Sequence, residues 1–586
     1  MNKKLYFEKY ENQLPYTSRQ IGKLENLIFQ FLGICTIISG LYYLIERWED
    51  SINTKCLWFT LPLIIAENLS MIGTILFVIT LWENKIIKPK SPVKFISEIQ
   101  SNSKKEKEKI SIDIFITTYN ESNELLKYTV NDCKKLRYKY EDIPINIYLL
   151  DDGNRNGQDT SKENIKEYCS TEGIVYLSRA NNIGYKAGNL RNGIEQSKGD
   201  IVVILDADTR VFPNFLNHTI GYFRNKKVAW VQTPQWFYDI PRPKYVLIKN
   251  ERNILKKLKK IMMSYNDPLG NDTQGFYNVI LQRRNYHNAA FCCGAGSLHR
   301  RSALMEAAVK EFTSKIKNEV KNLSTKNKKY DISQIVAETT ITPFEFHASE
   351  DLCTSLIIHG DKENKWKSIQ HPDVECKMLS TQNLKDKIKQ HQRYAEGTLD
   401  IAINKNPLLR SGLSISQKVC YASTIWSYLS PLWMSIFILS PILYFFTLQS
   451  PINTNSNDVI NYFTAFQIFN TITFIVAFWG IDTTRSEQFY VSGFWYLFES
   501  LTKIITGNKI EFHVTPKTKT KSNNIKYIIP HLTIITIGII GIIYNLNLIN
   551  NNEHPEPKAF LINLIWFIYT IWSFSAMIAS AFIDQE

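Results

Sequence analysis

Apolar and polar positions divide the chain into two kinds of region. Stretches with the length and apolarity of membrane-spanning helices predict about six spans, at roughly 27–45, 57–82, 422–446, 461–482, 527–549 and 560–582. The residues between the second and third spans are polar and mixed, and they contain no comparable run. The pattern therefore predicts an integral membrane protein with a large soluble domain inserted after its second span.

This division predicts five regions along the chain. They are an N-terminal tail with the first two spans at 1–82, the soluble domain with interfacial helices at 83–420, two spans at 421–482, a polar segment at 483–526 and two spans at 527–586. Within the polar segment, residues 485–508 are amphipathic and contain Glu487 and Glu499. We therefore predict one interfacial helix there instead of a seventh span.

Short β-branched runs alternate with helical patterns inside the soluble domain. Strands are expected at 112–118, 145–152, 174–178 and 200–208, with helices between them. This alternation favours an α/β fold built on a parallel sheet with helices on both faces. Such sheets bind ligands beyond the carboxyl ends of their strands. The first, second and fourth strands end in TTYNE, DDG and DAD, so polar and acidic groups should gather at one edge.

Lys and Arg residues cluster beside the predicted spans. The N-terminal tail and the segment after the second span are rich in them, whereas the 447–458 loop has none and the 550–558 loop has only Lys558. The positive-inside rule then places both termini, the soluble domain and segment 483–526 in the cytoplasm. The net charge of +14 fits anchoring against anionic lipid, so we expect a lipid bilayer and no nucleic acid as partner.

Asp206 and Asp208 follow the fourth strand as a D-x-D pair. Alone, they could be turn or capping residues. Alternation along an extended strand end would aim both carboxylates to the same side. Hard oxygen ligands of this kind suit Mg²⁺ or Mn²⁺, with substrate phosphates completing the shell. The DDG sequence has the same turn alternative, and Lys186 in KAGNL could meet a phosphate.

Taken in order, the motifs of the soluble domain and the segment after the fourth span resemble those of membrane-embedded processive glycosyltransferases of family 2. The likeness is greatest to bacterial cellulose synthase catalytic subunits and related β-glucan synthases. It rests on TTYNE, DDG, KAGNL, DAD, VQTPQWF (231–237), FCCGAGSLHRR (291–301), SED (349–351), QHQRY (390–394) and FHVTPK (512–517). The resemblance implies a cytoplasmic GT-A (Rossmann-like) domain inserted between helices that span a bacterial plasma membrane. It also implies inverting transfer from a UDP-sugar, coupled to polymer export.

The resemblance also assigns roles to individual residues. Asp351 in SED would be the general base, because the acceptor hydroxyl must lose its proton as it attacks. Its alternative is a helix N-cap. The motif usually begins with Thr, and Ser349 keeps the hydroxyl. Mg²⁺ or Mn²⁺ would be held by Asp206 and Asp208. The donor would be bound by Thr118, Tyr119, Glu121, Asp151, Asp152, Lys186, Gln390 and Arg393. The acceptor would be bordered by Phe291, Cys293, Gly294, Glu350 and Tyr394, and a gating loop would use Phe512, Val514 and Thr515.

Gln390, Arg393, Tyr394 and Gly397 would share one helix face, since they are spaced at i, i+3, i+4 and i+7. The family usually has Trp where Tyr394 stands, stacked under the acceptor sugar. The smaller ring and its hydroxyl suggest a shifted acceptor. We therefore hypothesise that Tyr394 loosens strict β-1,4 selection.

The expected reaction is extension of a β-glucan from UDP-glucose, with cellulose-like β-1,4 or mixed β-1,3/1,4 linkages. Curdlan, hyaluronan or chitin-like synthesis are alternatives within the class. A non-catalytic membrane scaffold is the alternative outside it, and the intact motif residues oppose it. The chain ends at Glu586 after the sixth span, so we expect no fused cyclic-di-GMP-binding module. The sequence leaves accessory subunits open.

Polar residues also occur within the predicted spans, among them Glu67. Ionisable groups at such depth usually face a bundle interior or a water-filled path. They would either line a polysaccharide channel or make helix–helix hydrogen bonds.

Overall fold

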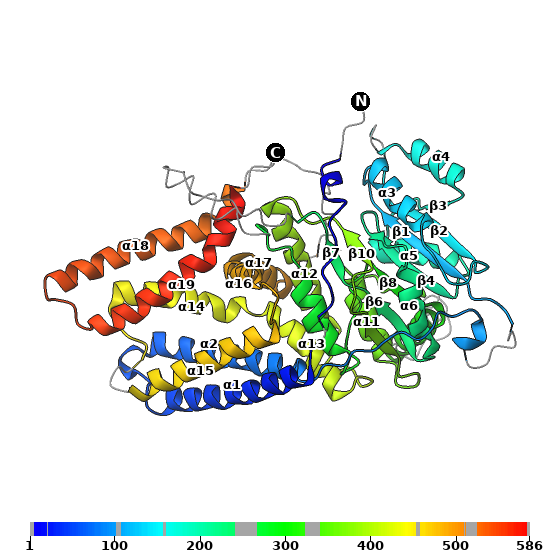
Figure 1. The fold of residues 1–586 in the computed structure, drawn as a ribbon. Helices are drawn as coiled ribbons and strands as arrows, with labels where there is room; N and C mark the ends of the chain where they lie inside the picture. The colour runs from blue at the N-terminus through cyan, green and yellow to red at the C-terminus, as the bar shows by residue number, and fades with distance from the viewer. Residues whose placement is uncertain are drawn as a thin grey trace.

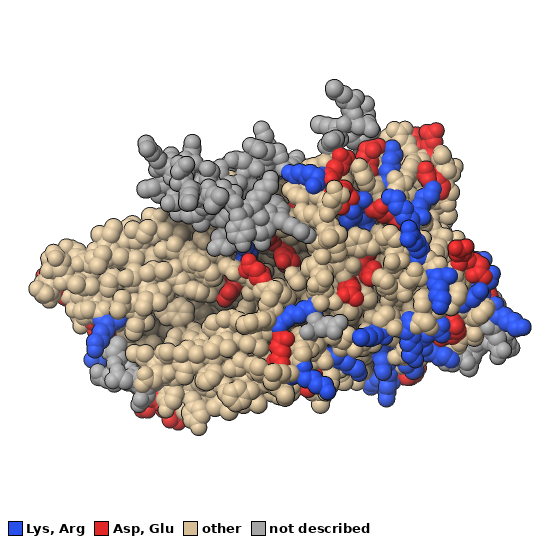
Figure 2. Space-filling view, viewed as in Figure 1, with Lys and Arg blue, Asp and Glu red and all other residues tan. Residues whose placement is uncertain are grey.

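The structure is a computed structural model. It describes residues 5–582 except 20, 101–106, 156, 158–159, 241–266, 323–339, 453–456, 509 and 511–523. A bundle of long helices forms one end of the molecule, and an α/β domain forms the other (Figure 1). Charged side chains gather over the α/β end, while the bundle surface is nearly free of them (Figure 2). This separation fits a bundle in lipid and a domain in water.

The α/β domain is built on a seven-stranded sheet in the order β3-β2-β1-β4-β8-β6-β9. Its strands are β1 (Ile112–Thr118), β2 (Ile145–Asp151), β3 (Val175–Ser178), β4 (Ile201–Asp206), β6 (Val228–Gln232), β8 (Ser297–Arg300) and β9 (Lys367–Gln370). β1 to β4 run parallel, as predicted. β8 runs antiparallel to both β4 and β6, while β6 and β9 are parallel to each other, so the sheet is mixed and the prediction of a parallel sheet was wrong for β8. The chain enters β8 from the loop at the carboxyl end of β4, where Gly296 N donates to Ile204 O, and must therefore run back.

Helices cover both faces of this sheet. On one face Ile114 and Val203 pack with α3 (Asn123–Lys134), and on the other Phe115 and Val202 pack with α5 (Tyr185–Glu195). Because successive strand residues point to opposite faces and both faces are covered, β1 and β4 are mostly apolar and are buried along nearly their whole length. Ser caps start two helices: Ser122 at α3, and Ser161 at α4 (Lys162–Glu172).

A smaller sheet, in the order β5-β10-β7, lies beside the first one. It consists of β5 (Arg210–Val211), β7 (Gln235–Phe237) and β10 (Cys376–Met378). Further elements of the domain are η3 (Ile96–Glu98), α6 (Phe215–Thr219), η5 (Ile220–Arg224), the π-helix η6 (Phe276–Leu281), α8 (Gln282–Arg284), α9 (Arg301–Asn322), α11 (Glu350–His359) and α12 (Leu384–Asn404). The start of the chain, with η1 (Glu8–Tyr10), packs against this domain, which the sequence did not indicate.

Among the described residues, five helices are long and apolar enough to span a membrane, and a bent pair gives a sixth if its two helices form one span, in line with the predicted number of about six. The helices are α1 (Lys23–Glu49), α2 (Leu57–Thr80) with η2 (Thr54–Cys56), α15 (Asn457–Ala477), α18 (Ile529–Asn550) preceded by η7 (Ile525–Tyr527), and α19 (Pro557–Ala581). The bent pair is α13 (Ile415–Tyr428) and α14 (Pro431–Thr447), at 41°. The predicted third span is therefore broken. Pro431, at the start of α14, has no N–H and disfavours a helical residue before it.

Segment 485–508 forms two helices instead of the predicted one. They are α16 (Thr484–Ser492) and α17 (Phe494–Ile505), joined at Gly493. A Cβ at Gly493 would lie 2.6 Å from Tyr496 Oη, so the junction is too close for a side chain. α16 packs against α19, whereas α17 packs against α12 of the α/β domain. The two helices therefore join the bundle to the α/β domain.

Glu67 pairs with Arg47 of the neighbouring helix, at 2.9 Å between Arg47 Nε and Glu67 Oε2. The Arg47 side chain is fully buried, and 12% of the Glu67 side chain is exposed. This contact is the helix–helix alternative that the sequence left open. A paired charge is the form in which ionisable groups persist at membrane depth.

Candidate functional site

Three strands bring their polar ends to one edge of the sheet. The parallel register sets Thr118 opposite Asp151 and Thr117 opposite Asp206, so the ends of β1, β2 and β4 lie level. A cleft of about 550 Å³ opens beyond this edge. Its volume is in the range of small-molecule and cofactor sites.

Most of the residues predicted from the motifs line this cleft. They are Thr118, Tyr119, Glu121, Asp152, Lys186, Asp206, Asp208, Cys293, Gly294, Glu350, Asp351, Gln390, Arg393 and Tyr394. The proposed donor, acceptor, metal and base residues therefore face one common space. They come from three strand ends, the loop before β8, and helices α5, α11 and α12.

Asp151 does not line the cleft. Its side chain is buried and accepts hydrogen bonds from Arg155 Nε at 2.5 Å, Tyr176 Oη at 2.7 Å and the Gly153 N–H at 2.9 Å. Arg155 in turn donates to Thr118 Oγ1 at 2.6 Å. Asp151 thus links the strand ends through buried hydrogen bonds outside the cleft, and the structure does not place it as a direct donor contact.

Phe291 is also absent from the cleft lining. It is buried beside Phe276, with the Arg284 guanidinium 5.3 Å from its ring. Its neighbours Cys293 and Gly294 reach the cleft instead. The predicted gating residues Phe512, Val514 and Thr515 lie outside the described residues.

Asp152 reaches the cleft but shares both carboxylate oxygens with Arg179. Arg179 Nε donates to Asp152 Oδ1 at 2.8 Å, and its Nη2 donates to Oδ2 at 2.5 Å. Arg179 also donates to the carbonyls of Ile183 and Tyr185. The same arginine therefore orients Asp152 and the turn before α5. No motif pointed to Arg179.

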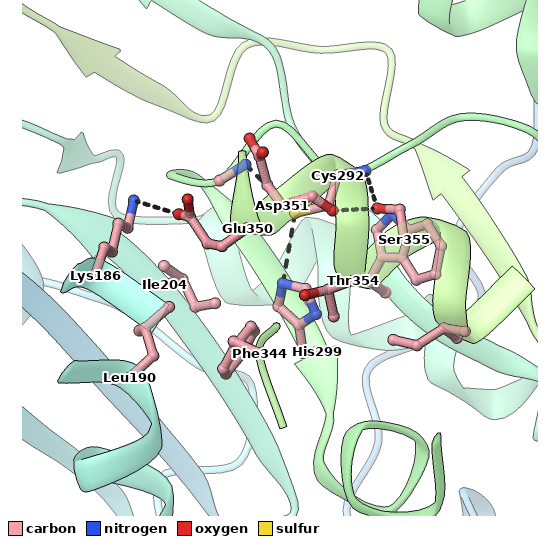
Figure 3. A pocket seen from close by; sticks show the side chains of 13 residues that line it. Lys186, Leu190, Ile204, Cys292, His299, Phe344, Glu350, Asp351, Thr354 and Ser355 are labelled. Carbon is pink, nitrogen blue, oxygen red and sulfur yellow. Dashed lines mark hydrogen bonds and ion pairs between the residues drawn. The ribbon is translucent and has the colours of Figure 1, made fainter. Parts of the chain in front are cut away.

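A lysine and two acids meet at the start of α11. Lys186 Nζ lies 2.5 Å from Asp206 Oδ1 and 3.9 Å from Glu350 Oε1. Asp351 is the next residue of α11, and its Oδ1 accepts the Leu352 N–H at 2.7 Å. Figure 3 shows Lys186 and Glu350 facing each other, with Asp351 beside them. The N-cap position belongs to Ser349, so the capping alternative for Asp351 is wrong.

Burial sets the protonation of this cluster. It raises the pKa of Asp351 above its ordinary value. Burial and the neighbouring Asp351 charge raise the pKa of Glu350 to about 7. Burial opposes the charge on Lys186, but Asp206 and Glu350 more than offset it and hold the pKa of Lys186 above its ordinary value. The cluster thus combines a cation with one carboxyl, that of Glu350, which exchanges its proton near neutral pH.

Replacing Lys186 with Met should shift the acid limb of the kcat/KM profile to higher pH. Asp351 accepts a proton only when ionised, so activity falls as the pH drops through its raised pKa. The Lys186 charge lowers that pKa, so its removal should raise it further. Initial rates measured across acid and neutral pH check this. Lys310→Met, which removes the ion pairs with Asp361 and Glu363 just beyond the other end of α11, is the control. An unchanged acid limb in Lys186→Met would contradict the coupling.

The loop before β8 is held by side chains that the motifs did not assign. The buried Ser355 hydroxyl accepts the Cys292 N–H at 2.8 Å and donates to the Asp351 carbonyl at 2.8 Å (Figure 3). Gln232 Oε1 accepts the Cys293 N–H at 2.8 Å, and Gln235 Nε2 donates to the Cys293 carbonyl at 2.9 Å. Both glutamines belong to VQTPQWF, a motif whose residues have no predicted role. Ser355 joins this loop to the helix that carries Asp351.

Gly294 brings the loop close to the two catalytic candidates. Its φ of 84° favours glycine, and a Cβ there would lie 3.5 Å from Lys186 Nζ and 3.6 Å from Asp351 Oδ2. Asp351 Oδ2 therefore points toward the loop, while its Oδ1 accepts the Leu352 N–H of α11. An acceptor hydroxyl bordered by this loop would meet the free carboxylate oxygen.

QHQRY lies on α12, as its spacing predicted, with Gln390, Arg393 and Tyr394 on the cleft. The fourth residue of the face, Gly397, contacts α11 instead. A Cβ at Gly397 would lie 2.1 Å from Ser349 Oγ, so only glycine permits this approach. α12 thus packs directly against the first residue of SED.

Asp206 and Asp208 are the residues that could hold a divalent cation. Both line the cleft, and the Leu379 N–H donates to Asp208 Oδ2 at 3.1 Å. Within the described part of the chain, no group of three or more His, Cys, Asp or Glu residues could hold a metal alone. Two hard carboxylate ligands fit an ion whose shell is completed by substrate oxygens.

Family models match both halves of the site. The model "Glycosyl transferase family 2" matches residues 113–307, and the model "Cellulose synthase" matches residues 339–579. The first covers the strand ends and the loop before β8. The second covers SED, α12 and the bundle helices after them.

Curated relatives are cellulose synthase catalytic subunits. That of Pseudomonas fluorescens is 23% identical over 94% of this chain and 66% of the relative, and cellulose synthase 1 of Komagataeibacter xylinus is 26% identical over 80% and 56%. The chain thus spans less than two thirds of these relatives. A solved mannosyltransferase from Pyrobaculum calidifontis, in complex with GDP-Man and Mn²⁺, aligns at 12% identity and TM-score 0.41, over 82% of this chain and 100% of that chain. A similarity this low carries no argument.

The two family models follow each other in the order that the motifs predicted, and the mixed sheet is that of a GT-A-like domain. The predicted family and fold are therefore confirmed. The chain thus matches the models of glycosyl transferase family 2 and of cellulose synthase one after the other, in a fold with helices long and apolar enough to span a membrane.

Proposed function

We propose that the protein transfers glucose from UDP-glucose to a growing β-glucan, processively and with inversion, and exports the polymer across the membrane. The observation that carries this proposal is the meeting of Asp351, Lys186 and the acceptor loop in one cleft that α12 also lines. α12 packs against α13 and α17, so the cleft adjoins the bundle. The relatives named as cellulose synthase catalytic subunits support the choice of donor and product.

The residues of the cleft would divide the reaction between them. Asp351 Oδ2 would take the proton of the acceptor hydroxyl as that oxygen attacks the anomeric carbon. Ser355, Gln232 and Gln235 would hold the acceptor loop against this base. Lys186 and Arg393 would offset the negative charge that develops on the leaving UDP.

Mg²⁺ or Mn²⁺ would be held by Asp206 and Asp208 together with the diphosphate of the donor. When bound, the ion would stabilise charge on the leaving group. Lys186 now contacts Asp206 at 2.5 Å, so it would share that carboxylate with the ion. The fit rests on the two hard oxygen ligands on the cleft wall.

The α/β domain would lie in the cytoplasm of a bacterial cell, with the bundle in the plasma membrane. The proposal rests on the Lys and Arg residues beside the spans and on relatives from bacteria. Donor UDP-glucose would then reach the cleft from the cytoplasm, and the glucan would leave through the bundle.

A panel of isotopically labelled UDP-sugars tests the donor. The purified full chain in nanodiscs should incorporate glucose from UDP-glucose and exclude N-acetylglucosamine and glucuronate. Preferred incorporation of either of those two sugars would instead favour a chitin-like or hyaluronan-like product.

Replacing Tyr394 with Trp should raise the share of β-1,4 linkages in the product. Tyr394 lines the cleft, and 41% of it is exposed, so its ring is available to the acceptor. A larger ring would enlarge the stacking face under the acceptor sugar and restrict which hydroxyl meets Asp351. Linkage analysis of polymers from both proteins checks this, with Tyr286→Trp, an exposed tyrosine outside the cleft lining, as control. Identical linkage ratios would contradict the role of Tyr394.

A further inference from the structure

The first described residues of the chain lie against the α/β domain, away from the bundle that they precede. We name residues 5–16 the N-terminal strap. Phe7 of the strap is 2% exposed and packs among Trp236, Tyr238 and Leu379. Its ring centroid lies 5.5 Å from that of Tyr128. A phenylalanine this buried is a fixed contact of the domain and not part of a loose tail.

Ion pairs fix the strap to the smaller sheet. Glu11 accepts from Lys377 Nζ of β10 at 2.7 Å, from Tyr238 Oη at 3.0 Å and from the Arg210 guanidinium of β5. Arg210 and Lys377 are paired residues of neighbouring strands. Glu11 therefore bonds to residues of two neighbouring strands. Because its charged partners are buried, these charge-assisted hydrogen bonds favour the docked position of Glu11 over a solvent-exposed one.

From the strap, hydrogen bonds lead to a cleft carboxylate. Tyr6 Oη donates to Asp239 Oδ2 at 3.1 Å, and Asp239 Oδ1 accepts the Ser380 N–H at 2.9 Å. The preceding amide, Leu379 N–H, donates to Asp208 Oδ2 at 3.1 Å. Two consecutive backbone amides thus join Asp239, which holds the strap, to Asp208, which lines the cleft. Asp208 and Asp239 are both buried.

We propose that the N-terminal strap is a positioning element of the donor site. Through Tyr6, Asp239 and the 379–380 backbone, it fixes the orientation of the Asp208 carboxylate. The proposal rests on the proposed function in assigning Asp208 to a divalent cation. A strap that only stabilised the domain would instead leave cation binding unchanged when its link to Asp239 is cut.

The test is Tyr6→Phe in the full chain in nanodiscs. Mn²⁺ binding in the presence of UDP is measured by electron paramagnetic resonance, independently of sugar transfer. Loss of one buried hydrogen bond should weaken Mn²⁺ binding about 3- to 10-fold and raise the Mn²⁺ requirement of transfer in parallel. Glu11→Gln, which loosens the strap from β5 and β10, should act in the same direction.

The matched control is Tyr10→Phe, in the same strap, since the Tyr10 hydroxyl makes no hydrogen bond to any described residue. Equal Mn²⁺ affinity of the Tyr6→Phe, Tyr10→Phe and unsubstituted proteins would overturn the proposal. If Mn²⁺ binding weakens but no protein makes glucan, the strap proposal stands and the proposed function fails. If the unsubstituted protein shows no saturable Mn²⁺ binding, both fail.

Discussion

Replacing Asp351 with Asn should lower the rate of glucose transfer by about 10²- to 10⁴-fold. The carboxamide is nearly the same size but cannot accept the proton of the acceptor hydroxyl. Among the described residues on the cleft, the other candidate acid next to it is Glu350, whose carboxyl is directed to Lys186 at 3.9 Å. Initial rates with UDP-glucose at saturating divalent cation measure the effect.

Two controls accompany this variant. Asp142→Asn makes the same chemical change on the surface, where Asp142 pairs with Lys94 and Lys109. UDP binding to Asp351→Asn should persist, because the predicted donor contacts lie on other elements. Undiminished transfer by Asp351→Asn would remove the base assignment. It would also revive the reading of the protein as a scaffold with another source of polymer.

Removing the divalent cation, or replacing Asp206 with Asn, should reduce transfer by at least about 10²-fold. Asp206 is a cleft carboxylate at the end of β4 and also the 2.5 Å partner of Lys186. Its loss would weaken cation binding and free Lys186 toward Glu350. Rates measured against Mg²⁺ and Mn²⁺ concentration, before and after chelation, check both forms of the prediction.

The matched control is Asp200→Asn, at the opposite end of the same strand. Asp200 accepts hydrogen bonds from the N–H and the hydroxyl of Ser111, far along β4 from the cleft. It should retain the cation dependence of the unsubstituted protein. Full transfer after chelation, or full transfer by Asp206→Asn, would contradict the assigned metal site.

The strand ends of the cleft could be predicted from the sequence because parallel register is a local consequence of the β-α-β pattern. Once β1, β2 and β4 were placed, Thr118, Asp206 and their neighbours had to lie at one edge. The face of α12 followed from helical spacing in the same way. The antiparallel β8 did not, since its direction depends on pairing with β4 and β6 across a long separation in sequence.

Belonging to a motif also does not show whether a residue lines the cleft or supports the residues that line it. Asp151 and Asp152 are adjacent, yet Asp151 is buried in an ion pair with Arg155, whereas Asp152 lines the cleft. The N-terminal strap could not be predicted for a related reason. A short segment such as 5–16 has no helical or strand periodicity, and the burial of Phe7 is created only by side chains from distant parts of the chain.

Polymer synthesis by the purified full chain in nanodiscs, given UDP-glucose and Mg²⁺, tests the central claim most directly. The product is sized, digested with linkage-specific β-glucanases and compared with that of Asp351→Asn. The predicted result is a long β-glucan that the enzymes degrade, formed without accumulation of short oligomers and absent from the Asp351→Asn reaction. A folded protein that binds UDP yet yields no β-glucanase-sensitive polymer would contradict the account.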